Sequence, residues 1–99
     1  VQTYAESHGC GVVRELVGHG VGHAVHENPP IPNFGKRGHG EKLCEGMVIA
    51  IEPMLTAGGY AVVLAPDEWT WKTKDGSRAA HFEHTVVVTK DSAKVLTEM

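Results

Sequence analysis

The residues best suited to catalysis or metal binding fall in three short segments. Each segment sets an imidazole or a carboxylate among small or β-prone residues, as a strand or tight turn would present a metal ligand. The segments are residues 18–29 with His19 and His26, residues 51–54 with Glu52, and residues 81–85 with Glu83. One imidazole and two carboxylates suit Mn(II), Fe(II), Co(II) or Zn(II) better than they suit a thiolate-type zinc site. The pattern predicts part of a hydrolytic metal centre.

Glu52 and Glu83 are the centre of this prediction. Both lie in apolar runs that are expected to be strands and that contain no Lys or Arg. A carboxylate that is buried without a partner is costly, and two carboxylates forced together repel each other. A divalent cation would neutralise both carboxylates at once. His19, which is flanked by glycines that allow close backbone approach, would add a neutral nitrogen ligand.

Simpler roles remain open for the same side chains. His19 also fits a core histidine that is hydrogen-bonded to backbone, and Glu52 fits a solvent-facing carboxylate at a strand end. His26 also fits the start of a proline-rich loop. His84 is a possible partner for Glu83, although alternation along a strand points the two side chains to opposite faces. Other histidines are interpreted as surface residues or as side chains that contact the ligands. These are His8, His39, His81 and His84.

The elements expected to position these side chains are mostly short strands. A helix is predicted over residues 1–8, and residues 28–46 are expected to form a long ordered loop because they are rich in Pro and Gly. Asp75 and Gly76 are expected to form a hairpin turn. Strands are predicted over residues 12–18, 24–26, 47–53, 60–64, 69–73, 80–89 and 95–96. Because the connections are short, the fold class is predicted as α+β, β-rich and mainly antiparallel.

Composition limits the classes of function that fit. The 99 residues allow one domain, residues 1–99, with a modest core. A net charge of −3 without a basic cluster argues against nucleic-acid binding. No apolar run approaches the roughly 18 residues of a membrane span. There is no secretory leader, and the two cysteines form no disulfide framework, so a reduced, cytoplasmic location is expected.

Three longer stretches resemble the C-terminal half of a type I methionine aminopeptidase, in metallopeptidase family M24. The stretches read GHGVGHAVHENPPIPNFG, MVIAIEPM and KTKDGSRAAHFEHTVVVT. The resemblance covers about residues 1–96 and implies the pita-bread fold, an α/β structure duplicated around a two-metal site. This chain would form its β-rich C-terminal half, a curved sheet with a truncated N-terminal helix. Glu52 and Glu83 are 31 residues apart, which is too few for the insertion of type II enzymes, and the first motif differs from those of prolidase and aminopeptidase P.

The resemblance also implies a role for individual residues. The implied metal ligands are His19, Glu52 and Glu83, and the implied substrate contacts are His26, Val25 and Trp69. His26 would steady the developing oxyanion, and Glu52 would also carry a proton from water to the leaving amine. Val25 and Trp69 would lie beside the pocket for the methionine side chain. Two divalent ions, of Co, Mn, Fe or Zn, are the implied cofactors, and the N-terminus of a nascent polypeptide is the implied substrate.

The resemblance also indicates what this chain lacks. The family takes two aspartate ligands and a further histidine from its N-terminal half, whereas Asp67, Asp75 and Asp91 stand in or beside turns. The chain is therefore expected to supply three of five metal ligands for removal of an N-terminal methionine, and to be inactive alone. The alternatives are an inactive pita-bread fragment that acts as an interaction module, and a chain that needs a complementing N-terminal half.

Overall fold

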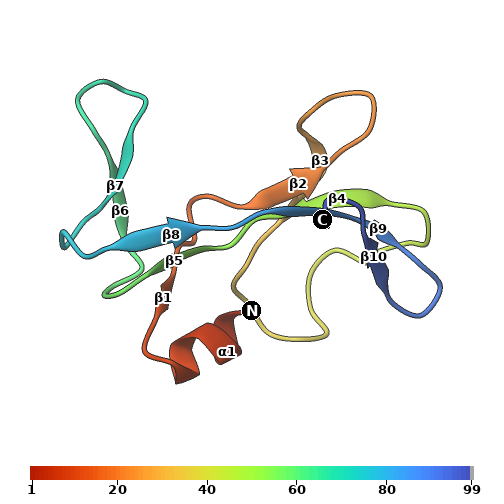
Figure 1. The fold of residues 1–99 in the computed structure, drawn as a ribbon, viewed down its shortest axis with the longest axis horizontal. Coiled ribbons are helices and arrows are strands. Elements are labelled where there is room, and N and C mark those ends of the chain that lie inside the picture. The colour runs from red at the N-terminus through yellow and green to blue at the C-terminus, as the bar shows by residue number, and fades with distance from the viewer. Residues whose placement is uncertain (99) are drawn as a thin grey trace.

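A computed structural model describes residues 1–98 of the chain. The described residues form one short helix and ten short strands in three sheets (Figure 1). In chain order the elements are α1 (Gln2–Ser7), β1 (Gly11–Val12), β2 (Gly18–Gly20), β3 (Glu27–Ile31), β4 (Val48–Ile51), β5 (Met54–Thr56), β6 (Val62–Leu64), β7 (Trp71–Thr73), β8 (Ala79–His81), β9 (His84–Val88) and β10 (Ala93–Val95). Within residues 1–98, no helix has the length and apolar character needed to cross a membrane.

A long antiparallel ribbon forms the frame of the fold. Its first half pairs β4 with β9, where Ile51 faces His84, and its second half pairs β5 with β8, where Met54 faces His81. Stepping inward one residue at a time from either pair assigns the same partners to the residues in between. The ribbon therefore continues without a slip through the two residues that separate β4 from β5 and β8 from β9.

The middle of the ribbon lacks one ladder hydrogen bond because Pro53 has no backbone N–H. Phe82, which lies opposite Pro53, still joins the two halves of the ladder, because its amide donates to the carbonyl of Pro53 at 3.2 Å. With the register unchanged, Glu52 lies directly opposite Glu83. The two carboxylate-bearing residues therefore face each other at the centre of the frame.

The other strands extend this ribbon on both sides. The five-stranded sheet has the order β10-β9-β4-β2-β3, and the three-stranded sheet has the order β1-β5-β8. The third sheet is the hairpin of β6 and β7, which leaves the ribbon between β5 and β8 and projects from it (Figure 1). These connections place β2, which carries His19, beside β4.

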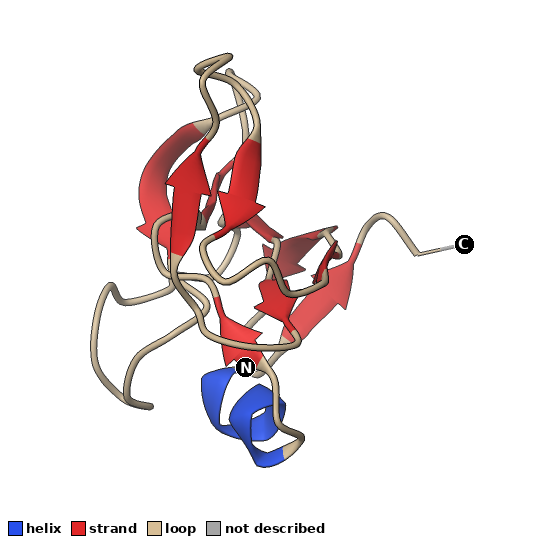
Figure 2. Cartoon of the chain, turned by 90° about the vertical axis from the view of Figure 1, so that its left-hand side faces the viewer, coloured by secondary structure: helices blue, strands red, loops and turns tan. Residues whose placement is uncertain are grey.

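The two sides of the sheets differ in what covers them. The helix α1 lies on one side, whereas the β2–β3 loop and the β6–β7 hairpin project from the other (Figures 1 and 2). Buried apolar residues come from the ribbon, from β1 and the residue after it, from the β6–β7 loop, and from one position of α1. This small core consists of Ala5, Val12, Val13, Ile49, Ala50, Ala65 and Val86.

Several predicted strands are wrong in their extent. The strand predicted over residues 12–18 is in strand conformation only at its ends, because the segment crosses from β1 in one sheet to β2 in another. Arg14 in this crossing is exposed, and its guanidinium lies 3.9 Å from the ring centre of Tyr60. Residues 24–26 are not a strand. The extended segment begins at Glu27, so the predicted long loop starts as β3.

The predictions for the second half of the chain also need correction. The strand predicted over residues 80–89 is two strands, β8 and β9. The strand predicted over residues 47–53 ends at Ile51, and β5, which begins just beyond that range, has no counterpart in the prediction. The hairpin predicted at Asp75 and Gly76 is wrong, because β7 pairs with β6 whereas β8 pairs with β5. Instead, the Asp75 carboxylate accepts a hydrogen bond from the Gly59 amide at 2.8 Å, which joins the two ends of the projecting hairpin.

Replacing Gly18 with alanine is expected to destabilise the fold by about 1–3 kcal/mol, the usual cost of overpacking. A Cβ at Gly18 would overlap the carbonyl oxygen of Ala50 and lie 3.2 Å from that of Ile31. Neither backbone can yield without disturbing β4 or β3. Gly59→Ala is the matched control, because its Cβ would meet only the Asp75 carboxylate at an ordinary 3.5 Å. Urea unfolding of both variants measures the difference, and equal midpoints would contradict the close approach of these strands.

Candidate metal centre

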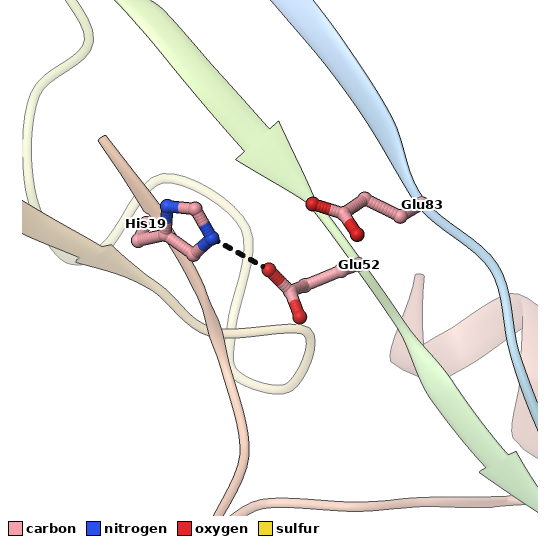
Figure 3. A group of neighbouring side chains, drawn as sticks. All are labelled: His19, Glu52 and Glu83. Carbon is pink, nitrogen blue, oxygen red and sulfur yellow. Dashed lines mark ion pairs between the residues drawn. The ribbon is translucent and has the colours of Figure 1, made fainter. Parts of the chain in front are cut away.

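Three of the predicted side chains converge on one face of the ribbon. His19 on β2 faces Ala50 on β4, and Glu52 is two residues further along the ribbon, whose register is unchanged there, and thus on the same face. Glu83, opposite Glu52, shares that face because directly paired residues project to the same side. The ligand atoms of His19, Glu52 and Glu83 lie within 4.8 Å of one another (Figure 3). Strand register therefore assembles this cluster from three separate segments.

The imidazole of His19 is oriented by its own backbone. Its Nδ1 lies 2.9 Å from the carbonyl oxygen of Gly20. Because a carbonyl oxygen only accepts, Nδ1 must carry the proton that it donates. This leaves Nε2 directed at the cluster, where it lies 2.9 Å from Oε2 of Glu52 (Figure 3). A histidine that binds a metal is held in the same way, with the second ring nitrogen donating to a carbonyl.

The two carboxylates differ in their exposure. The side chain of Glu52 is 12% exposed, whereas Glu83 is exposed. The prediction that both lie within strands is wrong, because each falls in a short break between two strands. His84 is not the partner of Glu83, since its Nδ1 lies 2.8 Å from Oγ1 of Thr97. The exposed Glu83 carboxylate instead has a ligand atom within 4.8 Å of those of Glu52 and His19.

The donor set fits a divalent cation. It combines one imidazole nitrogen with carboxylate oxygens from two residues, which suits Mn(II), Fe(II), Co(II) or Zn(II). Metal–ligand bonds of about 2.0–2.2 Å place ligand atoms of one ion up to about 4 Å apart. The observed spacing within 4.8 Å requires only small side-chain rotations. His19, Glu52 and Glu83 can thus hold a metal ion together.

His26 lies against the cluster from the β2–β3 loop. Its ring centre is 3.9 Å from that of His19, and the two rings are tilted by 33°. The loop is tied to its base, because Oε2 of Glu27 accepts a hydrogen bond from the amide of Ala24 at 3.2 Å. Val25 in the same loop is 75% exposed. His26 is itself exposed, so its imidazole can meet a molecule that approaches the cluster.

Trp69 was predicted to begin the strand over residues 69–73, but it lies in the loop that joins β6 to β7. The Asp67 carboxylate accepts hydrogen bonds from Oγ1 of Thr70 at 2.6 Å, from the amide of Thr70 at 2.8 Å and from the amide of Trp69 at 2.9 Å. These hydrogen bonds, that of the Thr70 hydroxyl first, lower the pKa of Asp67. Trp69 is 85% exposed. Its loop and the β2–β3 loop project from the same side of the sheets (Figures 1 and 2).

Two further residues touch Glu52 that sequence reasoning did not place there. Nε2 of His81 lies 3.5 Å from Oε1 of Glu52. The buried amide of Asn33, in the loop after β3, donates to the backbone carbonyl of Glu52 at 3.4 Å. Strand alternation could have indicated that His81 shares a face with Glu83, because it lies two residues earlier in the chain. No local pattern indicates Asn33, because its contact depends on how the loop packs.

Comparison with known proteins identifies the class. The sequence profile described as metallopeptidase family M24 matches residues 1–90, and the chain belongs to this family. Its closely similar relatives include the methionine aminopeptidase of Clostridium acetobutylicum, which is 50% identical over 97 residues. That alignment covers 98% of this chain and 39% of the relative. This chain therefore spans about two fifths of the length of the relatives that it matches.

Solved structures show the same relationship in three dimensions. The methionine aminopeptidase of Thermotoga maritima superimposes with a TM-score of 0.94 at 50% identity, over 100% of this chain and 40% of that chain. The enzyme from Rickettsia prowazekii gives a TM-score of 0.93 at 47% identity, over 98% of this chain and 40% of that chain. The expected fold class is confirmed: a mainly antiparallel, β-rich part of the pita-bread fold with one short helix.

Proposed function

We propose that this chain is the C-terminal half of a catalytic domain that removes the N-terminal methionine from nascent polypeptides in the cytoplasm. The observation that carries the proposal is the convergence of His19, Glu52 and Glu83 within 4.8 Å on one face of the ribbon. Its support comes from membership in metallopeptidase family M24 and from the methionine aminopeptidases that the whole chain resembles. Domain 1–99 would supply three of the five metal ligands in this scheme.

In this scheme each residue has a role that its position supports. His19, Glu52 and Glu83 would hold two divalent ions of Mn, Co, Fe or Zn, together with ligands from the part of the relatives that this chain does not span. When bound, such ions polarise the scissile carbonyl and lower the pKa of water towards neutrality. Glu52 moves a proton from water to the leaving amine, since a carboxylate at the cluster can both accept and return it. His26 donates a hydrogen bond to the carbonyl oxygen as negative charge develops there.

Substrate selection would come from the two exposed loops. The β2–β3 loop, which carries Val25, and the β6–β7 loop, which carries Trp69, project from the same side of the sheets (Figures 1 and 2), and these two residues are 75% and 85% exposed. Apolar groups that are left open to this extent can be covered by an apolar side chain such as methionine. The remaining wall of the pocket would come from the part of the protein that the relatives have and this chain lacks.

A chimera tests the proposed function. The matching 40% of the Thermotoga maritima enzyme is replaced by this chain, and release of methionine from a Met-Gly peptide is measured with Mn(II) or Co(II). We expect turnover by the chimera and none by the isolated chain, because only the chimera completes the ligand set. Turnover by the isolated chain would contradict the need for a second part. A folded, metal-binding chimera without turnover would favour the inactive interaction module.

A further inference from the structure

We propose that His81 is a positioning residue that holds the Glu52 carboxylate in its metal-binding orientation. The inference rests on the proposed function, because it concerns how one ligand of that centre is prepared. It starts from the contact between Nε2 of His81 and Oε1 of Glu52 at 3.5 Å. His81 itself lies outside the group of ligand atoms formed by the described residues His19, Glu52 and Glu83, so it acts through Glu52.

Strand register places two imidazoles symmetrically about Glu52. His19 faces Ala50, two residues before Glu52, and His81 faces Met54, two residues after it. Alternate residues of a strand share a face, and so do directly paired residues. Both imidazoles are therefore diagonal neighbours of Glu52 on the face that carries the cluster, one from each neighbouring strand. Long side chains span such diagonals.

Each oxygen of the Glu52 carboxylate has its own imidazole. Oε2 lies 2.9 Å from Nε2 of His19, and Oε1 lies 3.5 Å from Nε2 of His81. The second distance is longer than a good hydrogen bond. However, the His81 side chain is 46% exposed, so its ring has room to close the gap. Rotation of the carboxylate away from the cluster would break its contact with His81.

This arrangement prepares Glu52 before a metal ion arrives. The Glu52 side chain is 12% exposed, so water gives little support to any other orientation of the carboxylate. With Oε1 held by His81, Oε2 stays directed at His19 and the cluster. Partners that orient a ligating carboxylate contribute about 10–100-fold to metal affinity. An N–H donor on Nε2 provides the contact, and a different side chain with an N–H donor could replace it.

Calorimetric titration of the 99-residue chain with Mn(II) tests the inference. His81→Leu is expected to weaken binding by about 10-fold or more, whereas His81→Gln, which retains an N–H donor, should keep most of the affinity. His81→Thr is measured alongside, because its β-branched side chain suits a strand but is too short to reach Glu52. His23→Leu is the control, since His23 is an exposed histidine to which we assign no role. The visible absorption of bound Co(II) should change in the Leu and Thr variants only.

The outcomes separate the inference from the proposed function. If the unchanged chain binds Mn(II) and either His81→Leu or His81→Thr binds it as tightly, the positioning role is wrong and the proposed function stands. The role is also wrong if His81→Gln loses as much affinity as the folded variants without an N–H donor. If the unchanged chain binds no Mn(II), the same variants are titrated in the Thermotoga chimera; if that chimera also binds none, the ligand assignment in the proposed function fails, and the role of His81 falls with it.

Discussion

Replacing Glu83 with glutamine is expected to weaken Mn(II) or Co(II) binding by more than about 100-fold, as measured by calorimetric titration. The change keeps the shape of the side chain but removes its charge, so that a carboxylate ligand becomes a weakly donating amide. Loss of an orienting partner alone costs about 10–100-fold in affinity, and loss of the ligand itself should exceed that. Because Glu83 is exposed, the substitution leaves no cavity in the core.

The stability of the metal-free chain provides a second sign of the same cluster. Glu83 lies opposite Glu52, and with their oxygens so close their negative charges repel each other. Glu83→Gln should therefore leave the metal-free chain as stable as before or more stable, while abolishing the stabilisation by added metal. Glu45→Gln, an exposed glutamate between β3 and β4, should change neither property. Unchanged metal binding in Glu83→Gln would remove this residue from the ligand set.

Replacing His26 with alanine in the Thermotoga chimera is expected to lower kcat by about 10²–10³-fold with little change in KM. The magnitude is that of removing one hydrogen-bond donor to a developing oxyanion. His26 is suited to this role because its exposed ring lies 3.9 Å from the ring of His19. A contact made only in the transition state lowers kcat and kcat/KM by the same factor.

A histidine from the same loop serves as the control. His23→Ala removes an exposed imidazole that has no assigned role and should leave both kinetic constants unchanged. An increase in KM with constant kcat in His26→Ala would show that His26 binds the substrate without stabilising the transition state. Metal content should stay the same in both variants, because neither residue belongs to the group of ligand atoms.

The convergence of His19, Glu52 and Glu83 could be predicted from the sequence because of their residue types. A glycine-flanked histidine and two glutamates in apolar runs favour a shared cation, which would neutralise both carboxylates. Their meeting on one face follows from strand alternation once the register is known. The register itself cannot be derived locally, because the pairing of Ile51 with His84 spans residues far apart in the sequence. Only the assembled sheet shows that Glu52 lies opposite Glu83.

The errors have a common physical origin. A run of β-prone residues does not reveal whether its neighbours in space change along its length. Residues 80–89 were therefore predicted as one strand, although β8 pairs with β5 and β9 pairs with β4. The turn-forming Asp75 likewise indicates a turn without indicating which strands it joins. The contact of His81 with Glu52 escaped prediction because it depends on the same long-range register.

The unbroken ribbon determines where the chain can change in length. One residue inserted or deleted within residues 47–57 or 78–88 would turn every side chain beyond it to the opposite face, and the two glutamates would no longer meet. Residues 58–77 form an excursion that leaves the ribbon and returns to it at the same level. An insertion there, away from the Trp69 loop, would leave the two glutamates opposite each other. Engineered fusions and natural length variation should therefore concentrate in this excursion.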